Sequence, residues 1–463
     1  MVTRSLVWSL VTHPEDSAAH HLEPARQRDG ADEEVRSQSD LVERAQGELL
    51  DASHMSSPDE LPGIVSRVAA WFDGQDAMIY LADLQQRVLV PFRSFVGSHD
   101  EFPQPLGVDS TIAGRAFQHM EQLTQSPPGG HGDRVRIWLP LLNGTERLGV
   151  LGITQAVERL DDEAFMGRLR RFASMVAELV MTKTLYSDSI VRARRTSPMT
   201  LAAEIQWSLL PPLTFVNRSV TVAGGLEPAY EVAGDSLDYA VDEGTARFAV
   251  FDGMGHGIVS AQLISLVVAA YRNARRGGQS LVETAAHIES AVNDVFRVES
   301  FATGLICELD NTTGHLTWIS AGHHEPLLLR DGKLVHALEV APLLPLGLNQ
   351  SLTETLDAAV GTEHLQPGDM LLLYTDGVTE ARSPDGEFFG QDRLVDLVTR
   401  NLAAGLPAPE TMRRVVHALL GHQAGDLDDD ATLMLVEWHG GPGTEHDGRL
   451  FHSLTGAKVP GPR

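Results

Sequence analysis

Four short segments of the chain each place an aspartate at the edge of an apolar run: Asp235, Asp252, Asp376 and Asp429. Carboxylates that leave strand ends can converge on one edge of a folded sheet. Carboxylate oxygens and water, with no His or Cys among the ligands, suit Mg²⁺ or Mn²⁺. Two such ions, about 3.5–4 Å apart, can share a water, lower its pKa and direct it at phosphorus.

Each segment taken alone has a simpler explanation. An Asp-Gly pair after a strand, such as Asp252-Gly253, is usually a turn, because Gly supplies φ > 0 and Asp bonds its own backbone. The run Asp428-Asp429-Asp430 would usually be a solvated loop. The combination of four acids at the edges of apolar runs is what favours a metal site.

Strands must bring these acids together, and the chain from Val220 to Trp438 is rich in strand-like runs. The clearest candidates are Phe248–Phe251, Ala302–Leu309, Leu316–Ser320, Met370–Tyr374 and Thr432–Glu437. Their apolar and β-branched content is typical of buried strands.

The four segments, in this order, resemble the PPM (PP2C-like) metal-dependent phosphatases, in the bacterial branch typified by SpoIIE and by RsbU-type stress-response phosphatases. The approach Glu204–Pro211 and the element Ser320-Ala321-Gly322-His323 also resemble that branch. The resemblance covers Glu204 to Trp438. One departure is Ala233, where the family usually has Gly before Gly234-Asp235.

The resemblance implies two Mn²⁺ or Mg²⁺ ions and a set of ligands. Asp252 would bridge the ions with help from the Gly253 carbonyl, and Asp235 would anchor the second ion. Asp376 and Asp429 would complete the first, although Asp430 beside Asp429 leaves the register open. Asp238 matches a further family acid. His256 has two candidate roles, a general acid and, as we favour, a residue that holds its loop by hydrogen bonds.

The implied activity is that of a protein serine/threonine phosphatase in bacterial signalling. By resemblance, the substrate would be a phosphorylated STAS-domain protein, an anti-anti-sigma factor. The alternative is a catalytically silent sensory or scaffold protein that keeps the phosphatase fold. Loss of a metal acid would mark that alternative, and all four acids are present.

The N-terminal part of the chain resembles a GAF domain, a sensory module. The resemblance rests on two apolar runs, Val135–Leu142 and Arg147–Ile153, separated by the hairpin signal Asn143-Gly144. We expect an unknown small ligand or protein to bind there and to control the phosphatase. The fold class is therefore α+β: a GAF-like α/β sensor followed by a PPM α-β-β-α sandwich of two antiparallel sheets.

Between the two domains we expect linker helices. Residues 160–196 should form one long helix in which Phe165, Leu169, Phe172, Val176 and Leu179 follow the spacing of a coiled-coil seam. That stripe would either pair with a second copy in a homodimer or pack on its own GAF-like sheet. A second helix should start at Ser197, with Ser as N-cap and Pro198 in its first turn. The expected domain limits are 1–54 disordered leader, 55–159 sensor, 160–210 linker helices, 211–439 phosphatase and 440–463 disordered tail.

The composition narrows the partners and the compartment. The 463 residues include 36 Lys and Arg against 63 Asp and Glu, a net charge of −27. Phosphate-rich surfaces attract Lys and Arg, so this balance argues against nucleic acid or an anionic membrane as partner. With one cysteine, no apparent signal peptide and no run of about 18 apolar residues, we expect a cytoplasmic protein.

Overall fold

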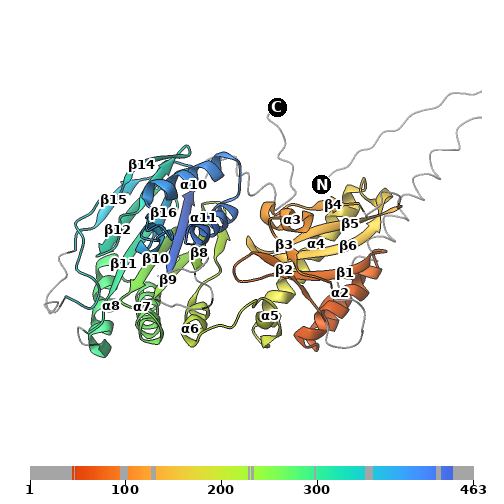
Figure 1. Cartoon of the computed structure of the whole chain (residues 1–463), viewed down its shortest axis with the longest axis horizontal. Coiled ribbons are helices and arrows are strands. Elements are labelled where there is room, and N and C mark those ends of the chain that lie inside the picture. The colour runs from red at the N-terminus through yellow and green to blue at the C-terminus, as the bar shows by residue number, and fades with distance from the viewer. Residues whose placement is uncertain are drawn as a thin grey trace, which may run out of the picture.

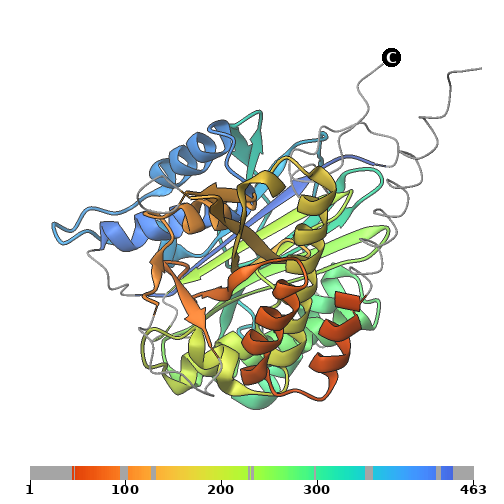
Figure 2. The same ribbon diagram turned by 90° about the vertical axis from the view of Figure 1, so that its right-hand side faces the viewer.

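The chain forms two α/β domains that lie side by side along its longest axis in the computed structural model (Figure 1). The N-terminal domain stands in front of the C-terminal domain in Figure 2. The structure describes residues 44–45, 47–93, 103–126, 132–227, 230, 234–296, 299–349, 358–423 and 429–441. The leader predicted at 1–54 lies outside this description up to residue 43, and so does the predicted tail after residue 441. Residues 47–54 are helical, and Leu49 is buried in the N-terminal core.

The N-terminal domain is built on one antiparallel sheet with strand order β3-β2-β1-β6-β5-β4. The strands are β1 (Gln75–Ala82), β2 (Val88–Phe92), β3 (Leu106–Gly107), β4 (Leu123–Gln125), β5 (Arg134–Asn143) and β6 (Glu146–Ala156). The helices are η1 (Pro58–Glu60), α2 (Leu61–Ala70), α3 (Ile112–His119), η2 (Val157–Arg159), α4 (Glu163–Thr184) and α5 (Asp188–Ala193). The predicted hairpin is confirmed, since β5 and β6 pair across a turn in which Gly144 has φ +59°.

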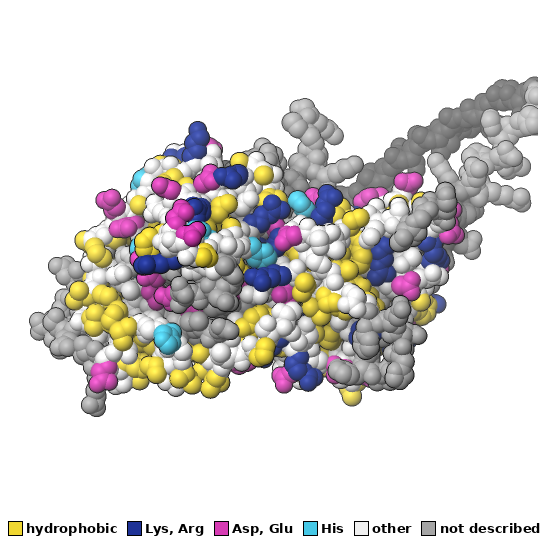
Figure 3. Space-filling view, in the orientation of Figure 1, with side chains coloured by type: hydrophobic (Ala, Val, Ile, Leu, Met, Phe, Trp, Pro, Cys, Tyr) yellow, Lys and Arg dark blue, Asp and Glu magenta, His cyan; other side chains and the backbone are white. Residues whose placement is uncertain are grey.

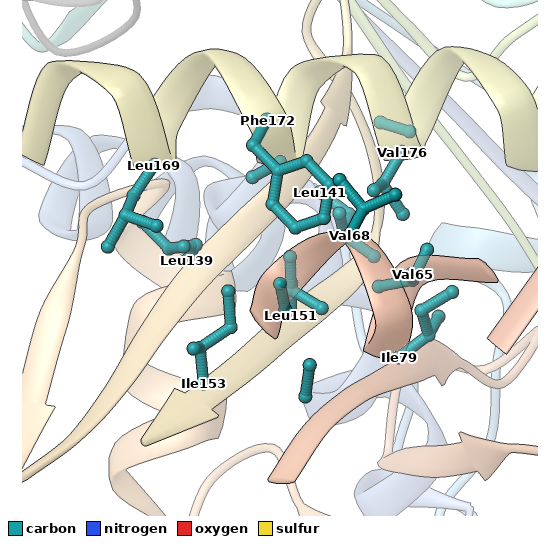
Figure 4. Packing of buried hydrophobic residues seen from close by; sticks show 14 of the residues in the cluster. Val65, Val68, Ile79, Leu139, Leu141, Leu151, Ile153, Leu169, Phe172 and Val176 are labelled. Carbon is teal, nitrogen blue, oxygen red and sulfur yellow. The ribbon is translucent and has the colours of Figure 1, made fainter. Parts of the chain in front are cut away.

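Side chains of this sheet alternate between two cores, as the two-residue period of a strand requires. Leu139 and Leu141 of β5 point to the face covered by α2 and α4, and Trp138 points to the face covered by α3. Figure 4 shows Leu139, Leu141 and Leu151 of the sheet against Leu169 and Phe172 of α4.

The residues of the predicted coiled-coil seam lie on helix α4. Phe165, Leu169, Phe172 and Val176 are buried in the core of their own domain, and Leu179 is partly buried against it, which is the second of the two alternatives that the spacing allowed. Figure 4 shows Leu169, Phe172 and Val176 in this core. The single long helix predicted over 160–196 is wrong. The helix ends at Thr184, and Ser187 caps α5 by accepting a hydrogen bond from the Ser189 N–H.

The helix predicted to start at Ser197 starts instead at Leu201, as α6 (Leu201–Leu209). Thr200 is its N-cap, with a side chain that accepts from the Ala203 N–H. Thr200 therefore supplies the cap that we had assigned to Ser197.

The C-terminal domain is a sandwich of two antiparallel sheets with helices outside each (Figure 1). The first sheet has the order β15-β12-β11-β10-β9 and the second β14-β13-β16-β17-β8-β7. The strands are β7 (Thr214–Val216), β8 (Val220–Glu227), β9 (Asp235–Val241), β10 (Thr245–Gly253), β11 (Ala302–Asp310), β12 (His315–Ala321), β13 (Leu327–Arg330), β14 (Lys333–Ala337), β15 (Gly361–His364), β16 (Met370–Tyr374) and β17 (Ala431–Trp438). The helices are α7 (Ile258–Arg276), α8 (Leu281–Phe296), α9 (Asp376–Thr379), α10 (Gln391–Ala403) and α11 (Ala408–His422).

Three cores stack through this sandwich. Met434 and Val436 of β17 point between the sheets, where Phe248 and Val250 of β10 meet them. Leu433 and its odd-numbered neighbours in β17 point to α10 and α11, and the outer face of the first sheet packs on α7 and α8. The α-β-β-α sandwich predicted for this part of the chain is therefore confirmed.

An ionic cluster joins the two domains at α11. The Arg147 Nη1 of β6 lies 3.0 Å from Glu410 Oε2 of α11, and both side chains are at most 3% exposed. Arg413 donates to both Glu410 carboxylate oxygens and also pairs with Asp109 of the N-terminal domain. His417 Nε2 contacts the Gln85 carbonyl at 2.8 Å. The β1–β2 and β5–β6 turns therefore rest on one helix of the sandwich.

The outer surface mixes charges of both signs. Figure 3 shows acidic and basic side chains interspersed over the face seen there, with apolar side chains between them. Among the described helices, none is long and apolar enough to cross a bilayer.

Glu437 lies on β17, and its burial in the sandwich changes the pH at which its carboxyl titrates. Burial raises the pKa of Glu437 to about 7. Between the ordinary carboxyl pKa and pH 7, the folded state therefore holds a proton that the unfolded chain has lost, and folding stability falls as pH rises. We expect Glu437→Gln to raise the free energy of unfolding by on the order of 1–3 kcal/mol at pH 8 and by little at pH 4.5.

Urea unfolding of the full chain at the two pH values measures this difference. Glu243→Gln, at an exposed position in the β9–β10 turn, is the matched control and should change nothing at either pH. If Glu437→Gln raised the free energy of unfolding equally at both pH values, the pH dependence of stability could not be assigned to the Glu437 carboxyl.

Candidate metal centre

The predicted acids of the first sheet lie where the core between the sheets ends. Phe248 and Val250 of β10 point into that core, and Asp252 is the next residue of the same register. Asp235 is the direct cross-strand partner of Asp252 on β9. Leu237, two residues after Asp235, also points into the core. The alternation of the strands thus places both carboxylates on the inner face at one edge of the sandwich.

The second sheet meets this edge through Asp430 and Thr375. One carboxylate oxygen of Asp430 accepts hydrogen bonds from the backbone N–H groups of Gly234 and Asp235. The Thr375 hydroxyl donates to Asp235 Oδ2 at 2.6 Å, and it accepts from the Thr432 N–H at 2.9 Å. The starts of β9 and β17 and the end of β16 are therefore tied together beside the acids.

Asp376 comes two residues after Tyr374, the last residue of β16, and opens the short helix α9. Gly377 is required next to it, because a Cβ at that position would lie 1.8 Å from the Asp430 carbonyl oxygen. The close approach of β17 to α9 brings Asp429 near Asp376, and burial first, then the charge of Asp376, raise the pKa of Asp429. This contact extends the acidic edge from the first sheet to the second.

The electrostatics show that the carboxylates crowd one another. Burial first, and then Asp252 and Asp430, raise the pKa of Asp235 well above its usual range. Burial and the charges of Asp376, Asp429 and Asp430 raise the pKa of Asp252 to about 7. Burial, partly offset by the two backbone hydrogen bonds, raises the pKa of Asp430 to about 6. A cluster that holds its protons this tightly gains from a cation placed among its members.

The donor set fits hard divalent cations. It consists of carboxylate oxygens, and Asp430 Oδ1 is buried with no hydrogen-bond partner among the described residues. Within the described ranges, no three His, Cys, Asp or Glu side chains are grouped so as to hold one ion by themselves. Mg²⁺ commonly keeps several waters and takes one or two carboxylates, so it does not need a closed protein cage. The residues present therefore fit hydrated Mg²⁺ or Mn²⁺ ions.

The remaining candidates named from the sequence, which include Gly253, Asp429, Asp430 and His256, have different surroundings in the structure. The Gly253 carbonyl accepts from the Ser260 hydroxyl at 3.0 Å, which leaves it one lone pair. Asp429 is exposed. Asp430 is 2% exposed, with Oδ2 bonded to backbone N–H groups and Oδ1 without a hydrogen-bond partner among the described residues. His256 is exposed and makes no ring hydrogen bond to the described residues, unlike the loop-holding role that we favoured. Ala233 and Asp428 lie outside the described residues.

Asp238 does not face the acidic edge. Its carboxylate pairs with Arg272 and Arg275 of α7, on the outer side of the first sheet. The sequence contained the signal for this placement, because Asp235 and Asp238 are three residues apart on one strand and so must point to opposite faces. Asp238 holds α7 in place and is remote from the inner-face acids.

Comparison with known proteins identifies this domain. Residues 242–439 match the sequence profile of Stage II sporulation protein E (SpoIIE). The C-terminal domain is thus similar to SpoIIE over most of its length. Phosphoserine phosphatase RsbU of Bacillus subtilis (strain 168) is 28% identical to this chain over 249 residues, which are 52% of this chain and 70% of RsbU.

Two further relatives extend the comparison of the SpoIIE-type domain. Protein IcfG of Synechocystis sp. is 26% identical over 284 residues, 55% of this chain and 43% of IcfG. Phosphoserine phosphatase RsbP of Bacillus subtilis (strain 168) is 28% identical over 245 residues, 51% of this chain and 57% of RsbP. The chain thus spans about half the length of these two relatives.

Among solved structures, the SiaA-PP2C domain of Pseudomonas aeruginosa is similar to 51% of this chain and 94% of its own, at 22% identity and a TM-score of 0.43.

Proposed function

We propose that this chain is a metal-dependent phosphoprotein phosphatase that acts on phosphoserine or phosphothreonine. The observation that carries the proposal is the meeting of Asp235, Asp252, Asp376 and Asp429 at one edge of a SpoIIE-type sandwich. Burial and the charges of neighbouring carboxylates raise the pKa values of Asp235, Asp252 and Asp429 there. Two relatives of the domain, RsbU and RsbP, carry the name phosphoserine phosphatase.

The four aspartates would hold two Mn²⁺ or Mg²⁺ ions, with the Gly253 carbonyl as a further oxygen donor. Bound divalent ions supply a nucleophilic water at neutral pH and neutralise charge on the phosphoryl group. The chain's own part is to hold the carboxylates in place. Thr375 orients Asp235 by a hydrogen bond, and Asp430 fixes the backbone on which Asp235 stands.

Hydrolysis of p-nitrophenyl phosphate by the full chain tests the activity. We expect turnover with Mn²⁺ or Mg²⁺ and none in EDTA, because removal of the ions leaves only a repulsive cluster of carboxylates. Turnover that persists in EDTA would rule out the metal mechanism. A folded chain that binds Mn²⁺ but hydrolyses neither this ester nor a phosphoprotein would favour the silent scaffold.

For the substrate, we propose a phosphorylated STAS-domain protein, an anti-anti-sigma factor, in the cytoplasm. Support comes from the resemblance to the RsbU branch and from the similarity to RsbU and RsbP. Release of phosphate from a purified phosphoserine form of such a protein is the test. A kcat/KM no higher than that for a phosphoserine peptide of the same local sequence would show that the STAS fold is not recognised.

We also propose that the GAF-like domain controls the phosphatase, through an unknown small ligand or protein. The buried contact of Arg147 with Glu410 and the pairing of Arg413 with Asp109 provide the physical connection. Helix α11 packs on β8 and β17, and β17 begins at the acidic edge. The homodimer through the linker helix stays a prediction, and the burial of its stripe in the sensor core gives it no support.

A further inference from the structure

An exposed apolar surface borders the acidic edge on the side of the first sheet. Strand β10 ends at Gly253, directly after Asp252, and α7 begins at Ile258. In the loop between them and in the first turn of α7, Met254, Ile258 and Val259 are 42%, 44% and 55% exposed. We call these three side chains the apolar rim. The apolar rim thus adjoins one of the proposed metal ligands.

The loop that carries the apolar rim is held by hydrogen bonds at its backbone. The Met254 N–H donates to the Phe301 carbonyl at 3.0 Å, and the Ser260 hydroxyl donates to the Gly253 carbonyl at 3.0 Å. The outer side of the loop is open, since a Cβ added at Gly255 would meet no other atom within 4 Å. The apolar rim is therefore a preformed surface that a second molecule can reach.

The surroundings of the apolar rim carry little charge. No Asp, Glu, Lys or Arg occurs from Gly253 to Tyr271, although 21% of the residues of the chain are charged. Helix α6 packs on α7 and adds Leu201, which is 63% exposed. In Figure 3, apolar side chains gather along the lower edge of the C-terminal domain, where Figure 1 places α6 and α7. Exposed apolar side chains that lie together are typical of surfaces that bind other proteins.

A phosphoprotein bound at the acidic edge must place its chain against the borders of that edge. The side chain of phosphoserine is short, so the residues beside it lie against whatever surrounds the bound phosphate. On the first sheet, that border is the apolar rim. On the second sheet the border is acidic, because Asp376 opens α9 and the exposed Glu380 follows its last residue. An apolar side chain next to the phosphoserine therefore fits the border on the first sheet and not the border on the second.

We propose that the apolar rim selects the phosphoprotein substrate by binding an apolar side chain next to its phosphoserine. The inference rests on the proposed function, because it needs the phosphoserine to be bound at the acidic edge, and it adds a feature of the substrate. The contact removes apolar surface of both molecules from water, which favours binding in proportion to the area covered. A second copy of the chain is the competing occupant of the apolar rim, and the experiment separates the two.

Two synthetic phosphoserine peptides test the proposal, with the full chain and Mn²⁺. They differ only in the residues on either side of the phosphoserine, which are Leu in one peptide and Gln in the other. We expect kcat/KM for the Leu peptide to exceed that for the Gln peptide by about tenfold, the lower end of what an apolar contact contributes to discrimination between substrates. The difference should lie mainly in KM, because the apolar rim does not touch the phosphate.

Substitutions in the apolar rim should remove this preference. With Val259→Gln, and separately with Ile258→Gln, we expect the ratio of the two kcat/KM values to fall close to one, because a polar side chain replaces the apolar contact. Val335→Gln is the matched control. It makes the same chemical change at a residue that is 45% exposed on β14, the edge strand of the second sheet, and it should keep the wild-type ratio.

Three results would overturn the inference. The wild type could hydrolyse both peptides with equal kcat/KM, or folded Val259→Gln and Ile258→Gln chains could keep the wild-type ratio. The third is a wild-type dimer that Val259→Gln converts to a monomer in analytical ultracentrifugation, because a second copy would then cover the apolar rim. Thermal unfolding shows that each variant is folded. A wild type that hydrolyses p-nitrophenyl phosphate but does not distinguish the peptides removes this inference alone, whereas one that hydrolyses none of the three removes the proposed function as well.

Discussion

Asp252→Asn will lower the Mn²⁺-dependent hydrolysis of p-nitrophenyl phosphate by at least about 100-fold, because the loss of several kcal/mol of metal-derived stabilisation has that effect on rate. Asp252 lies between Asp235 on its own sheet and the Asp376–Asp429 pair on the other side. An asparagine amide at position 252 carries no negative charge. It therefore cannot help the neighbouring aspartates to neutralise the bound cations. Asp376→Asn should lower the hydrolysis rate by a similar factor, because Asp376 connects the acidic edge to the second sheet.

The same substitution should have the opposite effect on the metal-free protein. Burial and neighbouring charges raise the pKa of Asp252 to about 7, so an ionised Asp252 costs stability above that pH when no cation is bound. In EDTA at pH 8, we expect Asp252→Asn to unfold at the same temperature as the wild type or at a higher one. Thermal unfolding with and without Mn²⁺ measures both effects, and Mn²⁺ should stabilise only the wild type.

Asp242→Asn is the matched control, because it makes the same chemical change at an exposed position at the other end of the β9–β10 hairpin. It should leave the rate and both unfolding temperatures unchanged. Wild-type turnover by Asp252→Asn would show that the acidic edge is not where the phosphate ester reacts.

Much of the sandwich could be predicted from short stretches of sequence. The run Met370–Tyr374 is β16 itself, and Ala302–Leu309 falls within β11. These strands were readable because a buried strand leaves a continuous apolar run that ends where the chain turns. The four acids were found for the same reason, since each stands at such an end. Their role as metal ligands remains a prediction that the substitutions above test.

The features that the sequence did not reveal depend on contacts between distant segments. Asp430 bonds the backbone of Asp235, 195 residues earlier in the chain, and no local pattern encodes that pairing. Thr375 can bond Asp235 only because the fold brings together two residues that are 140 positions apart in the chain. The break after Thr184 was missed because an apolar stripe of helical period does not show where a helix ends. Ser187 was the available local signal, since it caps the next helix.

The joint between the two domains was likewise invisible in the sequence, and it carries the largest expected effect on stability. Glu410→Ala should lower the free energy of unfolding of the full chain by about 3–5 kcal/mol, the usual cost of removing one partner from a buried ion pair. Glu410 is fully buried and has Arg147, Arg413 and Arg414 as partners. Burial acts to raise the pKa of Glu410, but Arg413 and Arg147 outweigh it and hold that pKa below its ordinary value.

Urea unfolding at pH 7 measures the effect, with Asp396→Ala as the control. Asp396 and Arg400 form an exposed ion pair on α10, and its loss should cost no more than about 1 kcal/mol. The pKa of Glu410 is depressed, so its contribution exists above the ordinary carboxyl pKa and should disappear as pH falls through the folded value. If Glu410→Ala unfolds like the wild type at pH 7, then water reaches Arg147 and Arg413 in solution. The N-terminal domain would then not be held on α11, and the control that we propose for it would need another route, of which the linker α4–α6 is the covalent one.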